Sequence, residues 1–97
     1  MQRVEYTYFA PFVNSTFTAH HADIDVEMDL IQVAKRNLKR NVHLRENPFT
    51  LVFRSALKVI LPQGMYRMAT TGFEPQMIFI TAVGADADGI IYHAVFD

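Results

Sequence analysis

The sequence predicts an all-β domain: a small antiparallel six-stranded barrel or strongly curved sheet, with one short helix near the N-terminus. Pro, Gly and Asn residues divide the 97-residue chain into pieces of about strand length that are rich in β-branched and aromatic residues. Apolar and acidic residues alternate along 23–30, as in a strand with one face in water. The pieces 76–83 and 90–96 are apolar on both faces, and an Asp-Gly turn signal joins them.

Length and composition limit what kind of protein this is. The chain fits one domain over residues 1–97, with 51% hydrophobic and 20% charged residues. It has no cysteine, which excludes disulfides, thiolate metal sites and cysteine nucleophiles. No stretch has the length of a transmembrane helix or the apolar core of a signal peptide, so we expect a cytoplasmic protein without a membrane partner.

The first half of the chain predicts one helix and two strands. Residues 6–13 are expected to form one or two helical turns, with Thr7 as a candidate N-cap. Residues 16–22 form the first strand, and the second starts at 23. Its apolar parity slips after Leu30, which predicts a β-bulge near Leu30 and Ile31.

Four more strands follow. The third is expected to bury one face, and residues 62–64 then turn the chain into a fourth strand over 65–71. The last hairpin needs a cover on its second face, either the aromatic N-terminal segment or another subunit, and the two are compatible. The buried face of the third strand is predicted to comprise Phe49, Leu51, Phe53 and Leu57.

The stretch "GADADG", residues 84–89, resembles part of a calcium loop. Aligned on an EF-hand pattern, Asp86 and Asp88 fall on ligand positions, but Gly84 and Val95 fall where anionic ligands are required. Asp-Gly between two apolar runs is typical of a hairpin turn. The sequence therefore favours a turn and predicts no metal site here.

Two charged stretches adjoin one another. His21, Asp23, Asp25, Glu27 and Asp29 share one parity, which favours a solvated strand face over a metal or acid–base site, because a linear row does not enclose an ion. The run "AKRNLKRNVHLR", residues 34–45, lacks the aromatic residues of a single-strand nucleic-acid binder, and the net charge of −1 argues against a general polyanion binder. Pairing between the two stretches, within one molecule or across a subunit contact, is the simpler interpretation. The basic residues of the run are Lys35, Arg36, Lys39, Arg40 and Arg45.

Signatures of catalysis are missing from the sequence. It contains no Walker loop, dinucleotide fingerprint or nucleophile elbow, and its four histidines form no helical metal motif. We therefore expect no enzyme activity, no catalytic or metal site and no cofactor.

Four segments resemble a family of small bacterial proteins of unknown function and about this length: "FAPFVNSTF", "NPFTLVFRS", "LPQGMYRM" and "FITAVGADADGIIYHAVFD". Asn14 stands where the family pattern usually has Gly, and Asn tolerates positive φ better than other non-glycine residues. The resemblance implies a β-rich fold and carries over no catalytic residue. Some members are encoded near phage-tail-collar-like proteins, which implies a part in tail or fibre assembly.

The expected function is that of a non-enzymatic interaction or assembly protein with a protein partner or a second copy as its target. The predicted contact surfaces are the outer face of the last hairpin (Met77, Phe79, Ile91, Val95) and the charged second strand with its basic run (Lys35, Arg36, Lys39, Arg40). The alternative is a barrel that binds a small molecule in an apolar pocket. Such a pocket would be lined by Phe49, Leu51, Phe53, Tyr66, Tyr92 and Phe96.

Overall fold

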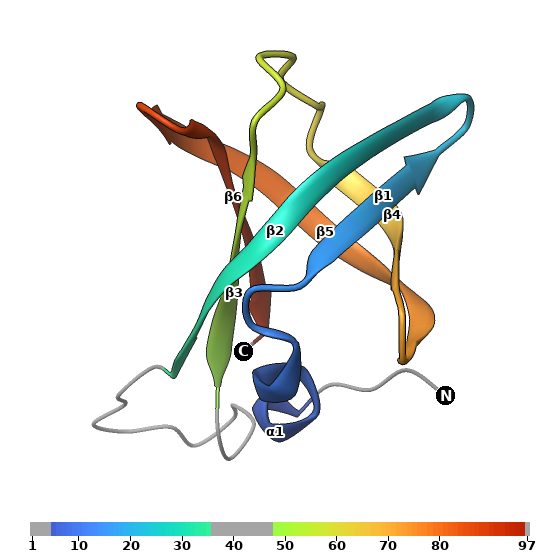
Figure 1. Cartoon of the computed structure of the whole chain (residues 1–97), viewed down its shortest axis with the longest axis vertical. Helices are drawn as coiled ribbons and strands as arrows, with labels where there is room; N and C mark the ends of the chain where they lie inside the picture. The colour runs from blue at the N-terminus through green and yellow to red at the C-terminus, as the bar shows by residue number, and fades with distance from the viewer. Residues whose placement is uncertain (1–4, 36–47, 97) are drawn as a thin grey trace.

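The computed structural model describes residues 5–35 and 48–96, in which six antiparallel strands close into a barrel (Figure 1). Around the ring the strands follow the order β1-β2-β3-β6-β5-β4, and β4 pairs back with β1. This confirms the predicted fold class. The elements are α1 (Tyr6–Phe9), a 3-10 turn η1 (Ala10–Phe12), β1 (Thr16–His21), β2 (Ile24–Lys35), β3 (Phe49–Ser55), β4 (Gly64–Thr70), β5 (Phe73–Asp86) and β6 (Gly89–Phe96).

The predicted β-bulge in β2 is present. Leu30 pairs with Phe53, whereas the residue before Phe53 in β3, Val52, pairs with Gln32, so Ile31 is the extra residue. Leu30 is fully buried and Val33 packs against the core, although the two residues differ in parity. The bulge therefore lets both Leu30 and Val33 face the core.

The N-terminal segment closes one end of the barrel. α1 lies below the strands in Figure 1, and the Phe9 ring is fully buried there. Its centroid lies 5.8 Å from that of Phe49, 5.9 Å from that of Phe73 and 5.5 Å from that of Phe96. The outer face of the β5–β6 hairpin is not covered by this segment, because its rings pack among those at the barrel end.

The start of α1 differs from the prediction. Glu5 is the N-cap, without a side-chain capping bond, and the Tyr8 N–H donates to the Glu5 carbonyl. Thr7 therefore lies inside the single turn and is not the cap. Pro11 lies in the first turn of η1, where its missing N–H leaves no bond unmade.

The β3–β4 connection, residues 56–63, passes over the opposite end of the barrel. The Tyr92 hydroxyl accepts from the Leu61 N–H (3.1 Å) and donates to the Val59 carbonyl (3.3 Å). The Tyr66 hydroxyl donates to the Pro62 carbonyl (2.6 Å). We call this connection the strap. The hydroxyls of Tyr92 and Tyr66 and the buried side chain of Leu61 hold it in place against the core.

Leu57 does not belong to the buried face of the third strand, so that prediction was wrong. β3 ends at Ser55, which takes the last buried position, and Leu57 is exposed. The Leu57 N–H donates to Ser55 Oγ (3.3 Å), which starts the strap and turns the chain out of the sheet. The other three predicted residues of that face, Phe49, Leu51 and Phe53, are fully buried.

Asn14 occupies the position where the sequence pattern led us to expect tolerance of positive φ. Its φ is 77°, and its N–H donates to the Leu30 carbonyl (2.6 Å) at the entry to β1. Glycine adopts this region freely, whereas a β-branched residue is strained by about 1–2 kcal/mol.

We expect Asn14→Gly to keep the stability of the wild type and Asn14→Val to lower the free energy of unfolding by about 1–2 kcal/mol in urea denaturation. Equal stability of the two variants would contradict the assigned backbone conformation.

Candidate interaction surfaces

Four large apolar side chains lie on the outside of three neighbouring strands. Met65 on β4, Met77 and Phe79 on β5 and Val95 on β6 are between 43% and 55% exposed. Met65 pairs directly with Phe79. Phe79 and Val95 each lie two residues from the Thr81–His93 pair, at which the pairing of β5 with β6 ends, and both are exposed on the outer face of their strands. We call these four residues the outer apolar face.

The structure places most of the predicted hairpin surface here. Met77, Phe79 and Val95 are exposed, and Ile91 is half-buried further along β6. Met65 was not predicted, because its place beside Phe79 depends on how β4 pairs with β5 and not on any local pattern.

The acidic residues of β2 lie on its outer face, as predicted. Asp25, Glu27 and Asp29 are exposed, while Val26, Met28 and Leu30 are buried. Asp25 Oδ1 lies 2.6 Å from Nδ1 of His20, and Asp29 Oδ1 accepts from the Thr16 hydroxyl (2.7 Å). The sequence had grouped His21 with these carboxylates. The two-residue turn after β1 instead pairs His20 with Asp25, and His21 lies beside the Tyr66 ring.

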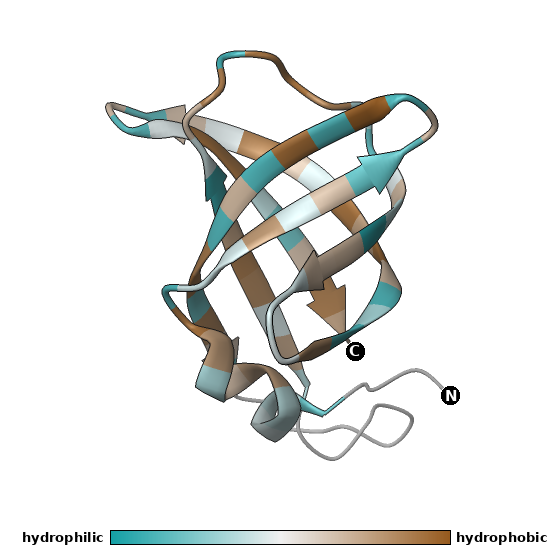
Figure 2. Ribbon diagram, turned by 45° about the vertical axis from the view of Figure 1, so that its right-hand side comes forward, coloured by the Kyte–Doolittle hydropathy of each residue, from teal (hydrophilic) through white to brown (hydrophobic). Residues whose placement is uncertain are grey.

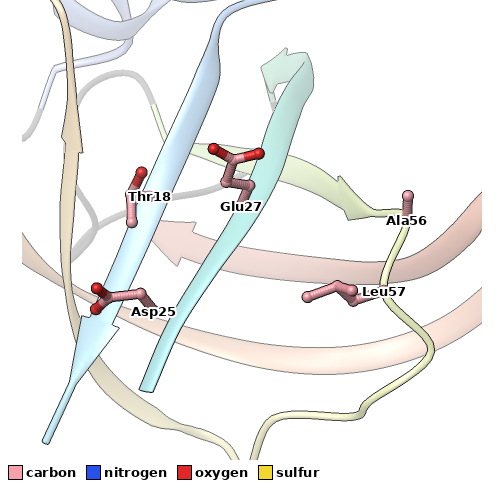
Figure 3. A pocket seen from close by; sticks show the side chains of 5 residues that line it. All are labelled: Thr18, Asp25, Glu27, Ala56 and Leu57. Carbon is pink, nitrogen blue, oxygen red and sulfur yellow. The ribbon is translucent and has the colours of Figure 1, made fainter. Parts of the chain in front are cut away.

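An open hollow of about 580 Å³ lies between this acidic face and the start of the strap. Figure 3 shows Thr18, Asp25 and Glu27 on the β1–β2 side and Ala56 and Leu57 on the other. The hollow thus has carboxylates on one wall and aliphatic carbon on the other. Within residues 5–35 and 48–96, no group of three His, Cys, Asp or Glu side chains is placed to hold a metal ion.

The strap carries an apolar surface that the sequence did not predict. Leu57, Val59 and Ile60 are 50%, 62% and 64% exposed. In Figure 2 the strap runs over the upper end of the barrel and is coloured largely as hydrophobic. The run 59–61 has no alternation, so the sequence could not show that Leu61 points inward while its neighbours point out.

Asp86 organises the hairpin turn that resembled a calcium loop. Its Oδ1 accepts from the Asp88 N–H (2.9 Å), and its Oδ2 lies 2.9 Å from Nη2 of Arg54 on β3. Asp86 pairs with Gly89, so Ala87 and Asp88 form the turn, and the predicted hairpin is confirmed. The bond from the Asp88 N–H and, after it, the Arg54 guanidinium hold the pKa of the Asp86 carboxyl below its usual value.

The lowered pKa of Asp86 predicts a specific acid sensitivity. A carboxyl with a lower pKa in the folded state stabilises the fold above its unfolded pKa, near 3.9, and this contribution is lost as the pH falls through the folded pKa. We expect Asp86→Asn to flatten the dependence of the unfolding free energy on pH between about 2 and 5. Arg54→Met should flatten it less, because it leaves the Asp88 N–H bond intact. An Asp86→Asn curve parallel to that of the wild type would contradict this assignment.

Most of the basic run falls outside the described residues, namely Arg36, Lys39, Arg40 and Arg45. Lys35 ends β2, and its Nζ lies 4.7 Å from the Tyr6 ring centroid and 3.5 Å from the Tyr6 hydroxyl. The last described residue of the run therefore contacts α1 at the end of the barrel opposite the strap.

The side chains predicted to line a small-molecule pocket are part of the hydrophobic core or pack against it. Phe49, Leu51, Phe53, Tyr66 and Tyr92 are buried, and Phe96 stacks on Phe49 with 4.7 Å between ring centroids. Each of these residues belongs to the core cluster or packs against it.

The fold and its surfaces define a small antiparallel β-barrel domain that presents apolar and charged side chains on its outside. The chain belongs to the family DUF6916, a domain of unknown function, which matches residues 4–96. No curated protein and no solved structure matches the chain. None of the helices in the described part of the chain has the length and apolar character needed to cross a membrane.

Proposed function

We propose that this domain is a non-enzymatic interaction protein that binds a protein partner through its outer apolar face. The observation that carries the proposal is the clustering of Met65, Met77, Phe79 and Val95 on adjacent strands, each exposed by more than two-fifths. Single exposed apolar residues are ordinary, but a contiguous patch of them favours a contact surface.

The closed sheet supports side-chain docking over strand addition. Each of the six strands has a hydrogen-bonded neighbour on both sides, so a partner has no continuous strand edge to extend. A partner must therefore bury side chains, and the two methionines suit this role because their flexible thioethers adapt to irregular surfaces. The family resemblance makes a phage-tail-like or fibre assembly the setting that we favour.

Capture from the native host tests the proposal. Wild type and Phe79→Lys are used as baits in parallel, and the retained proteins are compared by quantitative mass spectrometry. Lysine keeps a long stem but places a charge in the contact, so we expect the partner to be lost from the Phe79→Lys bait. Ile24→Lys, a change of similar exposure in the β1–β2 hairpin, is the control and should retain it. Identical proteins on the wild-type and Phe79→Lys baits would reject the proposal.

A further inference from the structure

The hollow beside β2 has two walls of different chemistry. Its volume of about 580 Å³ falls within the range of roughly 300–1,000 Å³ that is usual for binding sites. Thr18, Asp25 and Glu27 form one wall, and in Figure 3 the Leu57 side chain points from the other wall toward β2. A group that fills the hollow must therefore combine positive charge or hydrogen-bond donors with apolar carbon.

The polar wall offers acceptors and has no basic neighbour around Glu27. Thr18 pairs with Glu27 across β1 and β2, and Ala69 on β4 is the next residue in this row. Among the residues that the structure describes, none forms an ion pair with Glu27. The Glu27 carboxylate can therefore accept hydrogen bonds from a donor outside the domain.

The second carboxylate of this wall determines which kind of donor fits best. Asp25 Oδ1 lies 2.6 Å from Nδ1 of His20, but the Asp25 side chain is 66% exposed. Asp25 and Glu27 lie two residues apart on one face of β2, about 7 Å along the strand. An ammonium is a compact point charge, whereas a guanidinium presents five N–H donors in a planar fork and no acceptor. Two carboxylates at this separation therefore favour arginine over lysine.

The apolar wall is held firmly and continues beyond the hollow. The Leu57 N–H donates to Oγ of Ser55, which is fully buried. Further along the strap, Val59 and Ile60 are exposed, although the Val59 carbonyl accepts from the Tyr92 hydroxyl. Their exposure therefore belongs to a fixed part of the surface. Such a surface suits aliphatic residues on either side of an arginine in the hollow.

We infer that the hollow and the strap dock an arginine of a protein partner, with aliphatic residues next to it in the partner's sequence. The guanidinium binds the Glu27 carboxylate through two parallel N–H···O bonds, and a further N–H reaches Asp25. The stem of the arginine and its aliphatic neighbours lie on Leu57 and the strap. The acidic wall attracts a basic segment and repels an acidic one. This surface is separate from the outer apolar face, so Phe79→Lys should bind the arginine peptide described next like the wild type.

Titration of the domain with the peptide N-acetyl-Leu-Arg-Leu-amide, followed by NMR, tests the proposal. We expect saturable shifts of the amide resonances of Thr18, Glu27 and Leu57, which line the hollow. A peptide with lysine in place of arginine should bind about threefold more weakly, because it loses the bidentate pair. A peptide with citrulline, which keeps the shape of arginine without its charge, should bind about tenfold more weakly or worse. An arginine peptide that binds no better than either of these two, or that shifts only resonances outside the hollow, would overturn the proposal.

Substitutions in the two walls locate the contact. Glu27→Gln removes the charge and keeps the shape, so we expect the arginine peptide to bind about fivefold more weakly. Leu57→Ser removes apolar surface from an exposed position and should weaken binding about threefold. Glu74→Gln is the matched control, an exposed residue outside the hollow, and should bind like the wild type. Unchanged binding to both wall variants, or an equal loss in Glu74→Gln, would contradict the assigned site. Thermal unfolding followed by circular dichroism confirms that each variant is folded.

Two small probes distinguish a protein segment from other occupants of the hollow. Ethylguanidinium chloride carries the cation without aliphatic neighbours and should bind about tenfold more weakly than the arginine peptide. Equal affinities would show that the hollow takes a free small cation, and docking of a protein segment would be rejected. Calcium chloride tests the two carboxylates as a metal site and should leave the resonances of the hollow unchanged. Saturable calcium shifts that displace the peptide would also overturn the proposal.

Discussion

Replacing Gly89 with alanine is expected to destabilise the protein more than the same replacement at any of the other three glycines. A Cβ at this position would lie 2.0 Å from the Ser55 carbonyl oxygen and 2.7 Å from its carbon, both backbone atoms. The φ of Gly89 is 146°, a conformation that residues with a side chain rarely adopt. Backbone strain and overpacking each cost about 1–3 kcal/mol, so we expect a total loss of about 2–6 kcal/mol.

Chemical denaturation and thermal unfolding measure this effect. For a domain of this size the loss corresponds to a fall in Tm of about 8 °C or more. Gly84→Ala is the matched control in the same hairpin, because a Cβ there has nothing within 4 Å. We expect Gly84→Ala to change Tm by only a few degrees. Similar losses in the two variants would show that the Gly89 backbone does not need its close approach to Ser55.

Truncation of Phe9 is the second change with a large expected effect. Its ring is fully buried and contacts four others, those of Tyr8, Phe49, Phe73 and Phe96. Phe9→Ala should therefore cost about 3–5 kcal/mol, the range for a large aromatic side chain removed from a core. That is a large part of the total stability of about 5–15 kcal/mol of a natural domain.

Phe79→Ala makes the same substitution at a half-exposed site and is the control for Phe9→Ala. Measured at low protein concentration, it should cost about 1 kcal/mol or less. The comparison tests whether α1 is part of the folded core or only an appendage. A Phe9→Ala variant as stable as Phe79→Ala would show that the barrel does not depend on its N-terminal closure.

The strands were predictable where the alternation of apolar and polar residues shows which face of the strand is buried. The alternation in β2 and its loss of parity at Leu30 predicted both the strand and the bulge. β5 begins at Phe73, earlier than predicted, because Pro75 reads as a strand breaker. In the structure Pro75 lies opposite the register shift between Met68 and Thr70, where its missing N–H is tolerated.

The arrangement of the two barrel ends was not predictable from local pattern. The strap is held by Tyr92 and Tyr66, and Tyr92 follows the carbonyl that it binds by 33 residues. The aromatic N-terminal segment was one of two candidate covers for the last hairpin, the other being a second subunit, and its ring contacts to β3, β5 and β6 place it at the end of the barrel. The exposure of Met77, Phe79 and Val95 was predictable, because a strand with two apolar faces can bury only one in a small barrel.

The position of β6 between β3 and β5 also affects how the chain folds during synthesis. β6 is the last of the described strands to be made, yet it joins two strands made earlier. Until it is inserted, β3 and β5 each present an open edge, and such edges pair readily with other chains. The barrel closes only when strands that lie far apart in the sequence pair with one another, and such folding is slow, on the order of milliseconds to seconds for β-rich domains. The nascent chain is therefore most vulnerable to aggregation just before its final eight-residue strand is inserted.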